Sequence, residues 1–205
     1  RLVSRGLGDV YKRQDFDWAK RLNKTIKLVA QIDNSMDGFN ARVYPVLVDS
    51  KHPLAAIRGA LNAVLVEGEN INQLVFSGPG AGSAPTASAI IGDVFSACHQ
   101  MLSSQTNWYP LRTPKSGDKE FKDVQSSWFI RLSVKDEPGV LATIAGLFGE
   151  NNVSIESVIQ EGRGDNAELV LVTHEAEENN LTSSIESISK LSSVSSVTST
   201  IRVYI

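Results

Sequence analysis

The sequence predicts an α+β fold, and three observations lead to that prediction. Its 205 residues are 41% apolar and 21% charged, a composition typical of one or two globular domains. Segments with a two-residue apolar period, typical of strands, occur together with segments of helical period. In the last third of the chain these patterns follow the order strand, helix, strand, strand, helix, strand. That order is the split βαβ, or ferredoxin-like, arrangement, with two helices on one face of an antiparallel sheet.

The first segment, residues 1–14, differs from the rest of the chain. It carries four arginines or lysines and no repeating apolar face. It also resembles the translated adaptor read-through found at the ends of some metagenomic reading frames. We therefore expect a non-native segment, with the natural reading frame beginning upstream; a basic N-terminal arm is the alternative.

A helix and two strands are predicted next. The helix is carried by three apolar residues at helical spacing, Phe16, Ala19 and Leu22. The runs 25–32 and 41–48 are rich in β-branched and aromatic residues and predict strands. Pro45 indicates an edge or a bulge in the second strand, because proline has no N–H to give to the ladder.

A hairpin and a long helix follow. The runs 62–66 and 71–76 flank a turn and predict the hairpin. The helix comes after a glycine-rich stretch, and its apolar residues share one stripe: Ala87, Ile90, Ile91, Val94, Phe95, Cys98, Met101 and Leu102. A stripe of this kind must pack against something. We therefore expect Cys98 to be a buried structural thiol rather than a reactive one.

A linker is predicted at 104–126. This segment mixes polar residues and proline with little periodicity, and Pro110, Pro114 and Gly117 interrupt any helix. The expected domains are therefore 15–103 and 127–205.

The second domain opens with a strand and a helix. Trp128, Ile130, Leu132 and Val134 alternate with Phe129, Arg131 and Ser133, as expected for a strand covered on one face only. Pro138 suits the first position of the helix that follows. The buried stripe of this helix is predicted to be Val140, Ile144 and Leu147.

The remaining elements complete the predicted order. Val153, Ile155 and Ile159 alternate in the next strand, and 167–173 runs back as its hairpin partner. A second helix is indicated by Leu181, Ile185 and Ile188. The last strand carries Val197, Ile201, Val203 and Ile205.

This domain resembles the ACT family. The resemblance rests on the element order, on Asp136-Glu-Pro-Gly-Val-Leu-Ala142 after the first strand, and on Asn152-Val-Ser-Ile-Glu-Ser157 entering the second. It implies edge-to-edge pairing of two copies and an amino-acid effector held between the first loop of one copy and strand residues of the other. The effector residues that it implies are Asp136, Gly139, Val140, Asn152 and Gln160. The N–H groups of a helix N-terminus suit a carboxylate, and Gly139 admits close approach; the alternative is that the loop only caps a helix.

The segment 15–103 resembles homoserine dehydrogenases. Six blocks appear in the family's order: Asp17-Trp-Ala-Lys-Arg-Leu22, Ile26-Lys-Leu28, Arg42-Val-Tyr-Pro45, Pro53-Leu-Ala55, Asn62-Ala-Val64 and Gly80-Ala-Gly-Ser-Ala-Pro-Thr-Ala-Ser88. The resemblance implies the C-terminal half of a catalytic and dimerisation region, with its nucleotide-binding domain missing. The implied reaction interconverts L-homoserine and L-aspartate 4-semialdehyde with NAD or NADP, in the synthesis of threonine, methionine and isoleucine.

The glycine-rich stretch does not fit a dinucleotide fingerprint. From Gly78 or Gly80 the third glycine position holds Ser83 or Pro85, so Gly-x-Gly-x-x-Gly fails. The resemblance implies instead that Gly80, Ala81 and Gly82 pass close to the nicotinamide end of the cofactor. A tight turn with no ligand is the alternative.

Other functional classes are disfavoured. No catalytic residue is assigned, because the family's catalytic lysine and substrate carboxylates match nothing after Asp15. The three histidines are far apart in sequence, so no metal site is expected. A formal charge of −3 with scattered basic residues argues against nucleic-acid or membrane partners, and no apolar run is long enough to span a bilayer. We expect a cytoplasmic homo-oligomer, a dimer or a tetramer.

Two hypotheses follow. In the first, the chain is a fragment of a homoserine dehydrogenase whose ACT domain binds a regulatory amino acid, threonine being expected, and the fragment alone is inactive. In the second, it is a non-catalytic amino-acid sensor made of a dimerising sheet and an ACT module.

Overall fold

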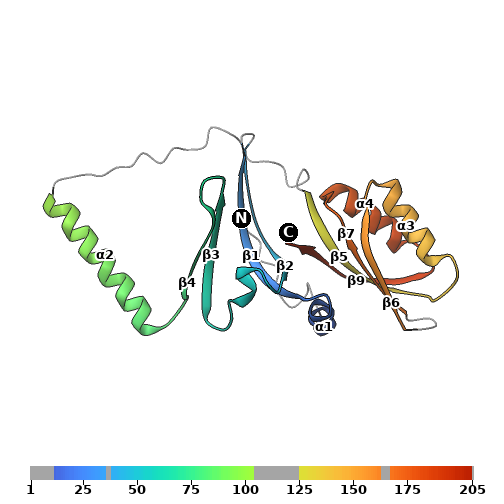
Figure 1. Cartoon of the computed structure of the whole chain (residues 1–205), viewed down its shortest axis with the longest axis horizontal. Helices are drawn as coiled ribbons and strands as arrows, with labels where there is room; N and C mark the ends of the chain where they lie inside the picture. Colours follow the sequence, from blue (N-terminus) through green and yellow to red (C-terminus); the bar gives the residue numbers. More distant parts are fainter. Residues whose placement is uncertain (1–11, 36–37, 104–124, 163–166, 205) are drawn as a thin grey trace. The chain divides into compact units, whose positions relative to one another are not determined.

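The computed structural model describes residues 12–35, 38–103, 125–162 and 167–204. The chain divides into two compact units, one made of Arg1–Ser50 with Lys115–Ile205 and the other of Lys51–Pro114 (Figure 1). The boundaries of these units differ from those of the expected domains, because the first hairpin of the chain joins the C-terminal sheet. Most of the expected linker, and residues 1–11, lie outside the described residues.

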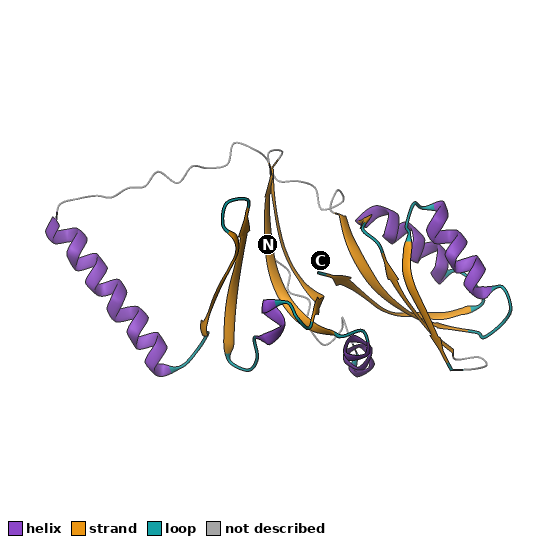
Figure 2. Ribbon diagram, in the orientation of Figure 1, coloured by secondary structure: helices purple, strands orange, loops and turns teal. Residues whose placement is uncertain are grey.

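A mixed sheet forms the larger unit (Figure 2). Its elements are α1 (Arg13–Arg21), β1 (Lys24–Ser35), β2 (Gly38–Asp49), β5 (Gln125–Val134), α3 (Val140–Glu150), β6 (Ile155–Glu161), β7 (Ala167–Thr173), β8 (Ala176–Glu177), α4 (Glu178–Ser189) and β9 (Val194–Val203). The strand order is β1-β2-β9-β5-β7-β6, with the short β8 beside β5. From β5 to β9 the predicted βαββαβ order is confirmed, with the short β8 as an additional strand before α4.

Strand β2 connects the first hairpin to the rest of the sheet. It pairs with β1 in an unshifted antiparallel register that runs through Pro45. It pairs in parallel with β9 from the next residue, through Val46 and Leu47. The strand therefore has no bulge at Pro45, and the proline lies just before the residues that pair with β9.

One face of the sheet is covered by α3 and α4 (Figure 1). The alternating residues Trp128, Ile130, Leu132 and Val134 of β5 are buried here, together with Ile144 and Phe148 of α3 and Leu181 and Ile188 of α4. The predicted helix stripes therefore cover the predicted strand face, with Val140, Leu147 and Ile185 partly buried against it.

The opposite face is buried as well, and the prediction of a strand covered on one side only was wrong. Phe129 is fully buried in a second core with Trp18 and Ala19 of α1. This core also takes in Leu47, Val170, Val172 and Ile201. Arg131, expected to face solvent, is only 2% exposed. The physical reason is that α1, more than a hundred residues earlier in the chain, lies against the face that α3 and α4 leave open.

Two local predictions are corrected. Pro138 does not occupy the first helical position: α3 begins at Val140, its N-cap is Gly139 with φ +91°, and Pro138 lies in the preceding turn. Ile155 and Ile159 do not share a face, because the β6–β7 register shifts between Ile155 and Ser157. Ile155 packs against the α3–α4 core and Ile159 against the α1 core.

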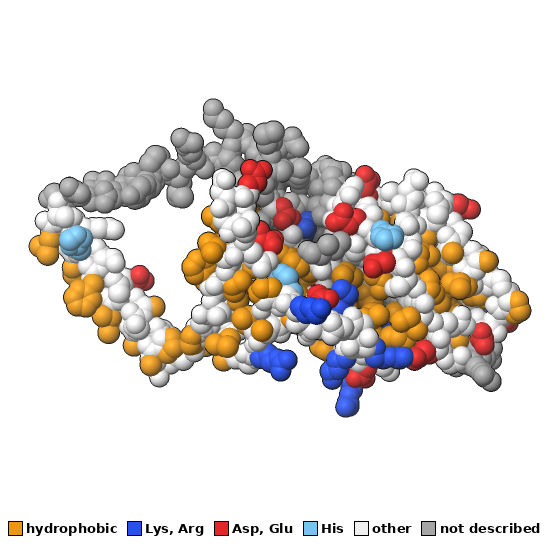
Figure 3. Space-filling model, viewed as in Figure 1, with side chains coloured by type: hydrophobic (Ala, Val, Ile, Leu, Met, Phe, Trp, Pro, Cys, Tyr) orange, Lys and Arg blue, Asp and Glu red, His pale blue; other side chains and the backbone are white. Residues whose placement is uncertain are grey.

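The smaller unit exposes most of its side chains (Figure 3). It contains the 3₁₀ helix η2 (Pro53–Ala56), the predicted hairpin β3 (Leu61–Gly68) and β4 (Asn72–Pro79), and α2 (Ser83–Ser103). No residue of α2 is buried, and the stripe residue Phe95 is 72% exposed. Cys98 is exposed, so the expectation of a buried thiol was wrong. The physical reason is that no other described element of this unit covers the helix.

Candidate functional site

The loop between β5 and α3 has the geometry expected of an anion site. Gly139 has a left-handed backbone conformation, and a Cβ built on it would meet nothing within 4 Å. Glycine is needed here for its positive φ, not to avoid a steric clash. Its carbonyl oxygen accepts the Thr143 N–H at 2.9 Å, which starts the helix.

The first turn of α3 offers backbone donors. The Val140 N–H donates a hydrogen bond to the Glu137 carbonyl oxygen at 3.3 Å. The N–H groups of Leu141 and Ala142 come next, in the turn where no helical carbonyl lies within reach. The positive end of the helix dipole adds to their attraction for an anion.

A carboxylate and an amide lie beside this turn. Gln160, near the end of β6, donates from Nε2 to Asp136 Oδ1 at 2.8 Å, and both side chains are exposed. The fold therefore brings together Asp136, Gly139, Val140 and Gln160. Backbone donors and a carboxylate side by side match the two charges of a free amino acid, since the donors suit its carboxylate and Asp136 suits its ammonium group.

Asn152 lies apart from the other four residues. It follows the C-terminal end of α3, with φ +58° and its N–H bonded to the Gly149 carbonyl at 3.0 Å. An eleven-residue helix separates it from Gly139, which corresponds to about 16 Å. Within one chain, Asn152 does not join the loop.

The glycines before α2 are explained by local structure. A Cβ on Gly80 would lie 1.9 Å from Asn62 Nδ2, so a side chain there would displace Asn62 at the base of the hairpin. Gly82 has φ +132°, and its carbonyl oxygen accepts the Thr86 N–H at 3.1 Å. Gly80, Ala81 and Gly82 are exposed. These local contacts account for both glycines without a ligand.

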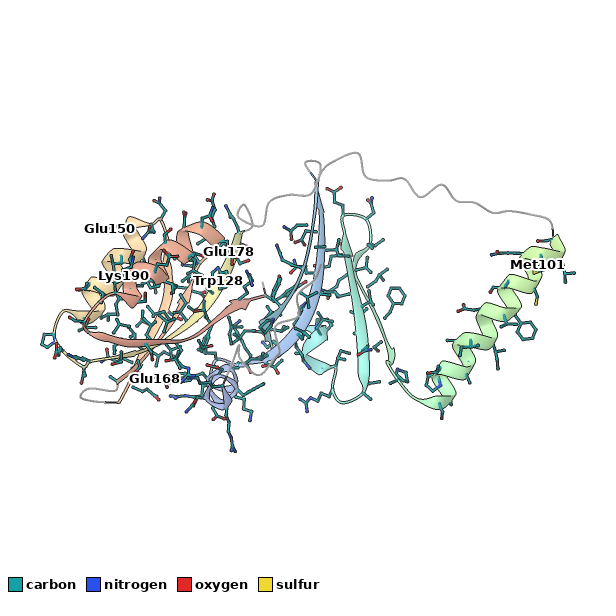
Figure 4. All side chains as sticks on the ribbon, turned by 180° about the vertical axis from the view of Figure 1, so that it is seen from behind. Met101, Trp128, Glu150, Glu168, Glu178 and Lys190 are labelled. Carbon is teal, nitrogen blue, oxygen red and sulfur yellow. The ribbon has the colours of Figure 1, made fainter. Side chains whose placement is uncertain are left out.

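An ionic cluster attaches α1 to the sheet, and sequence reasoning missed it. Arg131 of β5 donates from Nε to Asp15 Oδ1 at 2.9 Å, with the two side chains 3% and 0% exposed. Arg131 also pairs with Glu168 of β7, which lies next to α1 (Figure 4). Trp18 Nε1 donates to Glu168 Oε2 at 2.7 Å. The Asp15 carboxylate further accepts the backbone N–H of Lys12, which caps α1.

A second, exposed pair lies at the end of α1. Arg21 Nη1 donates to Glu161 Oε2 at 2.7 Å, and the guanidinium stacks 4.1 Å from the centre of the Trp18 ring. The hydrogen bond from Arg21 lowers the pKa of Glu161 from its ordinary value of 4.5, and the same bond raises the pKa of Arg21. The charged forms of both groups are therefore favoured.

One signal in the sequence pointed to a cover on the second face of the sheet, where α1 lies. The strands at 128–134 and 167–173 carry apolar residues on both faces, including Phe129, Val170 and Val172. Nearly continuous apolar runs are typical of strands covered on both sides. This signal, which the prediction of a one-sided cover did not use, shows that the second face needs a cover and does not show which segment provides it.

Within the described ranges, no group of three or more histidine, cysteine, aspartate or glutamate side chains could hold a metal ion. In the same ranges, no helix is both long and apolar enough to cross a membrane.

Comparisons with known proteins separate the chain into two parts. Residues 4–95 match the family model of homoserine dehydrogenase, and residues 128–193 match that of the ACT domain. The first match begins inside the segment 1–14 that was expected to be non-native, and Arg13 and Gln14 belong to the first turn of α1.

Three similar proteins are homoserine dehydrogenases. The homoserine dehydrogenase of Mycobacterium tuberculosis is 38% identical, over 92% of this chain and 45% of its own length. That of Bacillus subtilis is 34% identical, over 93% of this chain and 45% of its own. The crystal structure of a homoserine dehydrogenase from Thiobacillus denitrificans superimposes with a TM-score of 0.86 at 29% identity, covering 94% of this chain and 45% of that one. The chain thus spans about 45% of the length of these relatives.

Proposed function

This chain joins a homoserine dehydrogenase segment to an ACT domain, and from that premise we propose that it is the C-terminal part of an amino-acid-regulated homoserine dehydrogenase. The parent enzyme would interconvert L-homoserine and L-aspartate 4-semialdehyde in the cytoplasm. The observation that carries the proposal is the presence of both family matches, in this order, in one chain.

Hydride transfer would be supplied by NAD or NADP when bound. The residues of this chain that could approach it are Gly80, Ala81 and Gly82, through their backbone. Because the family's catalytic lysine and substrate carboxylates match no residue after Asp15, we expect the 205-residue chain to oxidise no NADPH in the presence of L-aspartate 4-semialdehyde. Steady loss of absorbance at 340 nm, the NADPH band, above a blank would contradict this.

The effector site is proposed at the β5–α3 loop. A free amino acid would place its carboxylate at the N–H groups of Leu141 and Ala142 and its ammonium group at Asp136. This is supported by the left-handed Gly139, which opens the first turn of α3, and by the exposed Asp136 carboxylate beside it. L-Threonine is the effector that the family resemblance favours.

Calorimetry tests this site. Titration of L-threonine into the chain should give saturable heat, and Asp136→Ala should abolish it. Glu137→Ala is the matched control, since it removes the neighbouring exposed carboxylate and should leave binding intact. The absence of heat with every proteinogenic amino acid, on a dimeric sample, would contradict an effector role.

We further propose that two copies pair through β6, which is an edge strand of the sheet and lies beside the β5–α3 loop. An antiparallel two-fold pairing centred on Val158 would bring the beginning of one β6 near the end of the other. Asn152 of the partner copy would then approach the Asp136 loop, which accounts for its distance from the loop within one chain. A residue on a two-fold axis meets its own copy, so Val158→Lys should convert the dimer to a monomer in analytical ultracentrifugation. An unchanged dimer would argue against this interface.

A further inference from the structure

Two glutamates lie opposite each other at one end of the β6–β7 hairpin. Glu161 and Glu168 are direct partners in the register, on the face that carries Ile159 and Val170 and is covered by α1. Like charges directly opposite each other weaken an antiparallel pair. This end of the hairpin therefore requires positive charge from outside the hairpin.

Helix α1 supplies one of the two positive charges that neutralise these glutamates. Arg21 of α1 pairs with Glu161, and Arg131 of β5 pairs with Glu168. The indole N–H of Trp18, also in α1, donates to the second oxygen of Glu168 at 2.7 Å. The hairpin end and the attachment of α1 consequently depend on each other.

The same strand end is held from its other face by the proposed effector loop. Gln160 precedes Glu161, and neighbouring strand residues point to opposite faces. Gln160 pairs with Leu169 of the α3–α4 core and donates to Asp136 at 2.8 Å. The last two residues of β6 thus contact Asp136 on one face and α1 on the other.

We propose that this strand end couples the amino-acid site to α1, with Gln160 and Glu161 as positioning residues. The inference rests on the proposed effector site. An ammonium group bound at Asp136 takes the acceptor that Gln160 uses, releases the strand end on that face and changes the Glu161–Arg21 attachment on the other. Because α1 leads into β1 within the homoserine dehydrogenase match, the change reaches that segment.

The first test needs no ligand. Gln160→Ala removes the contact with Asp136 without touching α1, and amide hydrogen exchange of α1 is measured in the 205-residue chain. Exchange should quicken by about threefold or more, as local opening becomes easier. Glu156→Gln, at an exposed position of the same strand, is the matched control and should leave α1 unchanged. Equal exchange in Gln160→Ala and the parent chain would overturn the coupling.

The reciprocal test starts from α1. Arg21→Met should shift the amide resonances of residues 136–140, on the opposite face of the sheet. Arg21→Lys keeps the charge and should retain the parent spectrum, and Lys20→Met removes an exposed charge from the same turn as a control. A purely structural role for Arg21 would leave the loop resonances where they are, and that result would also overturn the proposal.

Experiments with L-threonine distinguish a failure of the coupling from a failure of the proposed effector site. If calorimetry detects binding, α1 exchange must change on saturation in the parent chain and stay constant in Glu161→Gln. Binding without any change in α1 overturns the coupling. No heat with L-threonine counts against the proposed effector, while the two ligand-free comparisons still decide the coupling.

Discussion

Large apolar side chains form a buried core in the larger compact unit and are mostly exposed in the smaller one. Phe129 in β5 is fully buried beneath α1, whereas Phe95 in α2 is 72% exposed. Phe129 lies on the sheet face that also carries Val170, Val172 and Ile201, and Phe95 lies on the apolar stripe of α2. An apolar face indicates that a cover is needed, and only the fold tells whether the chain contains it.

The proposed function offers an explanation for the exposed apolar stripe of α2. Its stripe, with Ile90, Ile91, Val94 and Phe95 all more than half exposed, is far more apolar than a solvated helix face requires. In the proposed parent enzyme we expect this stripe to pack on the nucleotide-binding domain. In the isolated chain it would favour aggregation.

The largest effect expected from this contrast is on the free energy of unfolding. Phe129→Ala should lower it by about 3–5 kcal/mol, because a fully buried ring leaves a cavity. Phe95→Ala removes the same atoms from an exposed position and should change it by less than about 0.5 kcal/mol. Urea denaturation measures both. Similar losses in the two variants would mean that α2 is covered in solution.

The buried ion pair beneath α1 gives the next effect. Arg131→Met leaves the Asp15 carboxylate fully buried without its guanidinium, at a cost of roughly 3 kcal/mol of unfolding free energy. Adding Asp15→Asn to this variant removes the unpaired carboxylate charge and should recover part of the lost unfolding free energy. If the double variant is as unstable as the sum of the two single variants, the pair does not act as a unit.

A pair of glycines sharpens the comparison at α3. Gly139→Ala forces a side chain into a left-handed conformation and should cost about 1 kcal/mol. Gly146→Ala lies inside the helix, with open space around its Cβ, and should stabilise by about 0.5–1 kcal/mol. Opposite shifts of the melting temperature are therefore expected. A neutral Gly139→Ala would contradict the left-handed cap.

The smallest expected effect is the pH dependence of the Arg21–Glu161 pair. The pKa of Glu161 is lowered from 4.5 by the hydrogen bond from Arg21, so its contribution is fully present above that value. It is lost as the pH falls through the lowered pKa. The carboxyl carbon shift of Glu161 should titrate below 4.5 in the parent chain and return toward 4.5 in Arg21→Met. High salt should reduce the difference, because both groups are exposed. Titration at 4.5 in the parent chain would show that the pair does not form in solution.

Much of the fold was predictable from local pattern. The hairpin β3–β4, the helices α2, α3 and α4, and the strands β5, β6, β7 and β9 lie where apolar periodicity placed them; the short β8 was not predicted. Two local details were wrong: the start of α3, where Gly139 rather than Pro138 sets the boundary, and β6, where a bulge moves Ile159 to the other face. The predicted burial was also wrong at Arg131, which is buried, and at Cys98, which is exposed.

The candidate effector site was predictable in part. Asp136, Gly139 and Val140 are close in sequence, so their grouping needed only the local strand-to-helix turn. Gln160 lies 24 positions from Asp136 and meets it because β5 and β6 are both antiparallel to β7, so both strands end at the same end of the sheet. Asn152 shows the limit of the residue pattern, since the length of α3 keeps it away from the loop.

The sequence by itself determined which segments form helices and strands, which of their faces are apolar and where the chain needs glycine, because these depend on neighbours a few residues apart. Only the tertiary structure decided that Arg131 meets Asp15, 116 positions earlier, and that Arg21 meets Glu161, 140 positions later. Such contacts depend on strand order, register and the docking of α1 on the sheet, and the local spacing of residues carries no information about them.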